Sequence, residues 1–108
     1  MSAEPALDLT LRALADGNRR AILDVVRDQP RAVGEVAAEM DMSQQAVSHH
    51  LRVLRDAGLV DETRDGTRHL FLVRADGFAV VRQFVEGFWP DKLVALKTAA
   101  EKAVTDRG

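Results

Sequence analysis

The chain has 108 residues, 46% of them hydrophobic, which is enough for one domain with a packed core and too short for two. It contains no cysteine, and this excludes disulfides, thiolate metal ligands and thiol redox chemistry. The net charge of −2 is unlike that of strongly basic nucleic-acid-binding domains, yet residues 43–74 carry five arginines against four acids, an excess of +1, besides all three histidines.

The first half of the chain shows helical periodicity. Leucines spaced by four and three over residues 7–14 predict a first helix of two to three turns. A second helix is expected to be capped by Asn18 and to end at Gln29-Pro30, because a residue before proline disfavours helical geometry. Apolar residues at helical spacing over residues 33–40 predict a short third helix.

A fourth helix and a hairpin follow. Ser43 is a suitable N-cap for a helix that runs to about Ala57. The pattern then becomes extended, with strand-like runs at residues 59–63 and 68–73 on either side of Arg64-Asp65-Gly66-Thr67. Asp-Gly between two such runs predicts a hairpin whose two turn positions both favour positive φ.

Helical periodicity returns after the hairpin and continues to Phe88. Trp89-Pro90 is expected to interrupt this helix, and Asp91 to cap a last helix that extends to Ala100. The predicted fold is mainly α with a β-hairpin wing, in the order α-α-α-α-β-β-α(α). We expect one winged helix-turn-helix domain over residues 1–108, with dimerisation helices at both ends.

The third and fourth helices predict a helix-turn-helix, whose second helix lies in the DNA major groove. Val47, Leu51 and Leu54 form one face of the fourth helix, and side chains that are short or planar form the other. Such side chains bond to base edges and phosphates, and arginines at the hairpin tip would add a basic wing. The alternatives are an ordinary polar helix face and a structural hairpin with incidental arginines. Candidate DNA-binding residues are Ser43, Gln44, Gln45, Ser48, His49, His50, Arg52, Arg64 and Arg68.

Three segments resemble the ArsR-type winged helix-turn-helix regulators, a family named for the arsenical-resistance repressor. Residues 14–23 resemble its opening L-A-D-x-x-R-R-x-I-L, residues 42–60 its recognition helix with S-x-H-L-x-x-L-x-x-A-G-L-V, and residues 64–68 its wing. The resemblance covers about residues 7–100. It implies a dimeric repressor of a metal-independent branch, in which the first and last helices pair across a two-fold axis.

An apolar surplus in these helices also predicts a homodimer. A small monomer would cover only part of their apolar surface, and large exposed apolar patches mark interfaces. The aromatic cluster around Trp89 either belongs to the dimer core, which we favour, or lines a pocket for a small molecule or a partner protein. Candidate interface residues are Leu7, Leu11, Phe78, Val81, Val85, Phe88 and Trp89.

No metal site or cofactor is expected. The third helix offers no soft ligand, the helix up to Phe88 offers only Glu86, and zinc needs three or four convergent ligands. His49 and His50 point about 100° apart on a helix and do not easily share one ion. An enzyme is not expected either, since no phosphate loop or nucleophile–histidine–acid pattern is present.

The apolar runs are only a few residues long, and the first five residues lack the basic start and apolar stretch of a signal peptide, so we expect a cytoplasmic protein without a membrane span. The expected function is a transcriptional repressor that binds an inverted repeat in double-stranded DNA as a homodimer. The alternatives are a winged-helix module for protein interaction and a regulator controlled by a small-molecule or protein effector.

Overall fold

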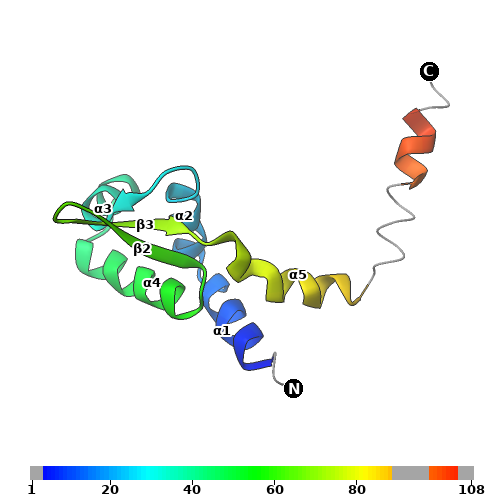
Figure 1. Cartoon of the computed structure of the whole chain (residues 1–108), viewed down its shortest axis with the longest axis horizontal. Coiled ribbons are helices and arrows are strands. Elements are labelled where there is room, and N and C mark those ends of the chain that lie inside the picture. Colours follow the sequence, from blue (N-terminus) through cyan, green and yellow to red (C-terminus); the bar gives the residue numbers. More distant parts are fainter. Residues whose placement is uncertain (1–3, 89–97, 105–108) are drawn as a thin grey trace.

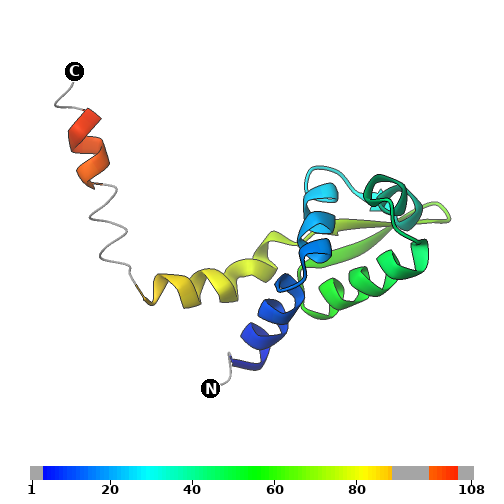
Figure 2. The same cartoon turned by 180° about the vertical axis from the view of Figure 1, so that it is seen from behind.

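The computed structural model describes residues 4–88 and 98–104. Four helices precede a hairpin, and α5 leads away from it beside α1 (Figures 1 and 2). The elements are α1 (Glu4–Leu14), α2 (Gly17–Val25), β1 (Arg31–Ala32), α3 (Val33–Met40), α4 (Gln44–Asp56), β2 (Val60–Asp65), β3 (Arg68–Val73), a 3-10 turn η1 (Ala75–Phe78) and α5 (Ala79–Glu86). Residues 98–104 are also helical.

The sheet has three antiparallel strands in the order β1-β3-β2, so the predicted hairpin is confirmed and β1 is an addition to it. Strand β1 has only two residues, too few for any periodic pattern, and it forms because β3 offers a free edge. It leads directly into α3 and thereby places the helix-turn-helix against the hairpin.

The hairpin turn differs from the predicted one by a residue. Asp65 still pairs with Arg68, which leaves Gly66 and Thr67 as the two turn residues. Of these only Gly66 has positive φ, at 66°, so the expectation of two positive-φ positions at Asp65 and Gly66 is wrong. Glycine is preferred at the first position of a type II′ turn, in which only that position has positive φ.

The N-cap of α2 is Asp16 and not Asn18. The Asp16 carboxylate accepts hydrogen bonds from the backbone N–H of Asn18 at 2.8 Å and of Arg19 at 3.3 Å, so Asn18 lies inside the helix. Helix α2 also ends earlier than predicted, at Val25, and the chain to Pro30 is a loop.

Both ends of α4 agree with the predictions, whereas α5 ends at Glu86, two residues before the expected Phe88. Ser43 caps α4, with its Oγ accepting from the N–H of Ala46 at 3.1 Å, and Gly58 follows the helix with φ 78°. A Cβ at Gly77 would meet the carbonyl oxygen of Gly58 at 1.8 Å. Only glycine therefore allows η1 to lie against the end of α4.

The core lies between the helices and one face of the sheet. The predicted apolar face of α4 is fully inside it, with Val47, Leu51 and Leu54 at 0–1% exposure. The buried hydrophobic residues are Ala13, Ile22, Leu23, Val26, Val36, Ala37, Val47, Leu51, Leu54, Leu59, Val60 and Phe71. Within residues 4–88 and 98–104, no helix is long and apolar enough for a bilayer.

Candidate nucleic-acid interface

The outer face of α4 is a continuous polar surface. Gln45, Ser48, His49 and Arg52 are all exposed, as the helical wheel predicts. Ser43 is exposed at the start of the helix, where backbone N–H groups face outward. These side chains thus present hydrogen-bonding groups to a partner along two to three turns of helix.

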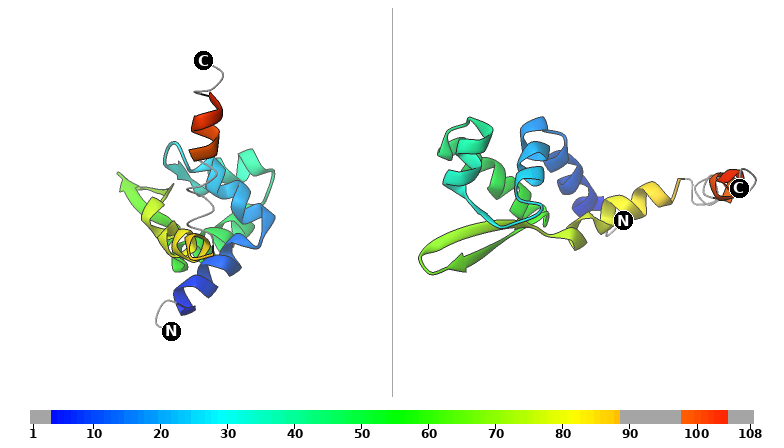
Figure 3. Two further views of the ribbon diagram at one scale, coloured as in Figure 1. Left: turned by 90° about the vertical axis from the view of Figure 1, so that its right-hand side faces the viewer. Right: turned by 90° about the horizontal axis from the view of Figure 1, so that it is seen from above.

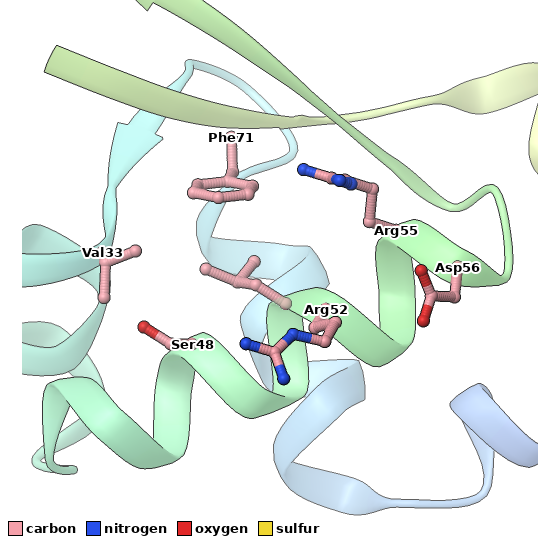
Figure 4. A pocket seen from close by; sticks show the side chains of 7 residues that line it. Val33, Ser48, Arg52, Arg55, Asp56 and Phe71 are labelled. Atoms are coloured by element: carbon pink, nitrogen blue, oxygen red, sulfur yellow. The ribbon is translucent and has the colours of Figure 1, made fainter.

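A hollow of about 410 Å³ lies between α4 and the sheet. Figure 4 shows Phe71 pointing from β3 toward α4, Arg55 turned toward the strands, and Ser48 pointing from α4 toward Val33 at the start of α3. Ser48 and Arg52 line this hollow together with Phe71 of β3, so the polar face of α4 borders the hollow on one side and the sheet borders it on the other.

The hairpin tip projects beyond the N-terminal end of α4 (Figures 1 and 3). Arg64 pairs with His69 across the strands, on the same sheet face as Phe71, which faces α4. Arg68 pairs with Asp65 and lies on the opposite face of the sheet. The two arginines that flank the tip therefore point to different sides of the wing.

Glu62 ties the wing to α4. Its Oε2 accepts from Nη1 of Arg55 at 2.6 Å, and its other oxygen contacts Nδ1 of His69. The hydrogen bond from His69, with the nearby Arg55 charge, holds the pKa of Glu62 below its usual range. Sequence reasoning missed this residue, although the hairpin register places Glu62 and His69 as diagonal neighbours on one face.

Glu35 ties the wing to α3. Its carboxylate accepts from Nη2 of Arg68 and, at 3.1 Å, from the backbone N–H of Ala32. The N–H of Ala32, followed by the charges of Arg68 and Arg31, lowers the pKa of Glu35. This contact joins residues 33 positions apart, so no local pattern in the sequence indicates it.

His50 lies apart from the other candidate residues of α4. It is half-buried, and its Nδ1 accepts from Nη1 of Arg19 at 3.4 Å. Gln44 is exposed beside Gly34 of α3. The structure therefore brings Gln45, Ser48, His49 and Arg52 together on one face, and turns His50 toward α2.

Apolar side chains remain uncovered on α1 and α5. Among the interface candidates, Leu11, Val85 and Phe88 are exposed, Phe88 to 70%, whereas Leu7, Phe78 and Val81 are half-buried. Phe78 packs against the core of its own chain, and Trp89 lies outside the described residues, as do Asp91 and the start of the last predicted helix. The structure adds exposed Leu9 and Phe84, and the Phe84 ring meets Phe88 edge-on at 5.0 Å.

Within the described ranges, no group of three or more potential ligand side chains is placed to hold a metal ion. The site is instead a polar helix with a hairpin beside it, built from α3, the turn at Asp41, α4 and the sheet. A helix-turn-helix followed by such a hairpin defines a winged helix-turn-helix protein.

Known proteins are similar to this chain in sequence and in fold. A family model described as a helix-turn-helix domain matches residues 14–63. The chain is 42% identical over 89 residues to the HTH-type transcriptional regulator Rv2034 of Mycobacterium tuberculosis, covering 82% of this chain and 83% of that protein.

Two solved structures of similar fold support the same family. The homodimeric winged helix-turn-helix DNA-binding domain Mb0332 of Mycobacterium bovis, a possible ArsR-family transcriptional regulator, matches with a TM-score of 0.67 at 30% identity, over 79% of this chain and 82% of that one. An ArsR-like regulator from Rhodococcus sp. RHA1 matches in fold with a TM-score of 0.75 at 23% identity, over 93% and 97% of the two chains. The chain therefore belongs to the ArsR family of winged helix-turn-helix transcriptional regulators.

Proposed function

We propose that the chain is a cytoplasmic repressor that binds an inverted repeat in duplex DNA as a homodimer. The observation that carries this proposal is the exposed face of α4, where Gln45, Ser48, His49 and Arg52 lie on one side of the helix. Repression is what the resemblance to the ArsR family implies. We expect neither catalysis nor a response to metal ions, and we expect DNA binding by α4 to need no cofactor.

In this proposal α4 enters the major groove. Gln pairs bidentately with adenine and Arg with guanine, so Gln45 and Arg52 are suited to base edges. Ser43 and the N–H groups at the start of α4 are suited to a phosphate. Arg64 would reach the backbone or the adjacent minor groove from the wing.

The dimer would form through α1 and α5. These helices contact each other within one chain, and their outer sides expose Leu9, Leu11, Phe84, Val85 and Phe88. Pairing them about a two-fold axis would bury that surface and present two copies of α4 about one DNA turn apart, roughly 34 Å. The homodimeric state of the Mycobacterium bovis domain supports this arrangement.

Selection of DNA from a random duplex pool by the purified protein tests the proposal. We expect enrichment of an inverted repeat whose half-sites are centred about 10 base pairs apart. Enrichment of single half-sites would contradict the dimer, and the absence of any enrichment at low salt would contradict sequence-specific binding.

A further inference from the structure

The two arginines of the wing have different surroundings. Arg64 has no ion pair within residues 4–88 and 98–104, whereas Arg68 is paired with Glu35 of α3. Both members of that pair are exposed, Arg68 to 54% and Glu35 to 44%, so a solvent-side ligand can approach either one. Only Arg64 therefore offers an uncompensated positive charge at the tip.

Glu35 is held in place independently of Arg68. Its carboxylate also accepts from the N–H of Ala32, the N-cap residue of α3, at 3.1 Å. The same N–H is the main reason that the pKa of Glu35 is lowered, so the group is ionised at neutral pH. The negative charge thus stays beside the wing when Arg68 moves.

We propose that Glu35 competes with DNA phosphate for Arg68 and thereby weakens binding to every duplex sequence. This inference rests on the proposed function. A phosphate oxygen and the Glu35 carboxylate both accept from a guanidinium group, and Glu35 already occupies Nη2 of Arg68. A phosphate that binds Arg68 also comes close to the fixed charge of Glu35, and like charges repel.

The competition involves no base, so it acts equally on all sequences. A regulator must find few operator sites among a great excess of other DNA, to which it is attracted mainly by charge. Glu35 therefore raises the share of the protein that is free of DNA, and it leaves the ratio between operator and non-operator affinity unchanged. The net charge of −2 likewise weakens the electrostatic attraction of the chain to DNA of any sequence.

The test is the affinity of Glu35→Gln for a mixed-sequence duplex, measured by fluorescence anisotropy between about 50 and 200 mM salt. Glutamine removes the charge and keeps an oxygen for the N–H of Ala32. We expect binding about two- to fivefold tighter, in the range of an exposed ion pair. The logarithmic salt dependence should steepen by about 0.9 for each additional phosphate that the variant neutralises.

Two variants control for charge and partner. Glu39→Gln removes the same charge from the same helix, but Glu39 pairs with Arg31 at 3.8 Å and not with the wing. We expect Glu39→Gln to increase the affinity less than Glu35→Gln does. An equal increase would mean that the change in net charge alone explains the effect, and it would overturn the inference. In Glu35→Gln with Arg68→Ala the increase should disappear, and an increase that persists without Arg68 would overturn the inference as well.

The outcomes separate this inference from the proposed function. A well-folded wild-type protein that binds no duplex at low salt would refute DNA binding altogether. Wild-type binding with a Glu35→Gln variant that binds equally or more weakly would refute only the competition, and weaker binding would make Glu35 a residue that positions Arg68.

A second comparison does not depend on the Glu35 variant being folded. In the wild-type background, Arg68→Ala should flatten the salt dependence less than Arg64→Ala, because Glu35 already neutralises Arg68. A change at Arg68 as large as the change at Arg64 would show that Glu35 does not compete.

Discussion

Arg19 of α2 contacts both α1 and α4 through one guanidinium group. Its Nε donates to the carbonyl of Ala13 at 2.8 Å and its Nη2 to that of Arg12 at 2.9 Å, at the C-terminal end of α1. Its Nη1 donates to His50 of α4. A cation at this end satisfies carbonyls without helical partners and complements the helix dipole. The helix proposed for dimerisation is thus fastened to the back of the recognition helix.

The residues proposed to read bases lie on the opposite side of α4. We predict that Gln45→Ala and His49→Ala each cost about 1–3 kcal/mol on a selected operator for every base that the shortened side chain no longer reaches, while binding to scrambled duplex is unchanged. Fluorescence anisotropy on both duplexes measures the difference. Gln29→Ala, an exposed glutamine in the loop after α2, is the matched control. Equal losses of affinity on the two duplexes would mean that α4 does not read sequence.

At the scale of elements, the start of α2 depends on Asp16. Asp16→Ala removes the acceptor for two N–H groups and should lower the midpoint of urea unfolding, whereas Asn18→Ala should have little effect. The two substitutions together distinguish the observed cap from the one expected from sequence. Similar losses of stability for both variants would contradict the assigned cap.

The same cap has a defined pH dependence. The N–H of Arg19 is the main cause that lowers the pKa of Asp16 in the folded protein. A carboxyl group whose folded pKa is lowered stabilises the fold above its unfolded pKa and loses that effect as the pH falls through the folded value. The difference in stability between wild type and Asp16→Ala should therefore be full at pH 7 and shrink below about pH 4. A difference that grows on acidification would refute the assignment.

The contact between η1 and the end of α4 is equally specific. Gly77→Ala would place a methyl group 1.8 Å from the backbone oxygen of Gly58, so one element must move. We predict a loss of about 1–3 kcal/mol in the free energy of unfolding, the range for overpacking. Gly34→Ala is the control, since its methyl would meet only the Gln44 side chain at 3.5 Å. Unfolding in urea measures both, and a neutral Gly77→Ala would show that η1 is free to shift.

For the whole molecule, we predict that the exposed apolar face of α1 and α5 forms the dimer interface. Phe88→Glu and Val85→Glu should give monomers or insoluble protein and abolish tight operator binding, because each would place a charge in the apolar interface. Gln83→Glu adds the same charge to the other side of α5 and should still dimerise. Analytical ultracentrifugation at micromolar concentration measures this, and a dimeric Phe88→Glu variant would exclude the interface.

Much of the fold follows from local patterns in the sequence. The helices α3 and α4, the Ser43 cap, the apolar side of α4 and the hairpin were all predicted, because periodicity, caps and turn residues act over a few neighbouring residues. The exposed candidates Gln45, Ser48, His49 and Arg52 were predicted for the same reason, since burial of one helix face determines which side chains face outward.

Tertiary structure determined which contacts the charged side chains of the wing and of α4 make. The two-residue strand β1, the turn of His50 toward Arg19, and the pairing of Arg68 with Glu35 each depend on residues far away in the chain. No periodicity encodes such contacts, because they arise only when packing of the core brings α3, α4 and the hairpin together. The sequence alone therefore determined which side chains of α4 are exposed, because burial of one helix face is a local property, and the packed structure determined which charges of the wing are already paired.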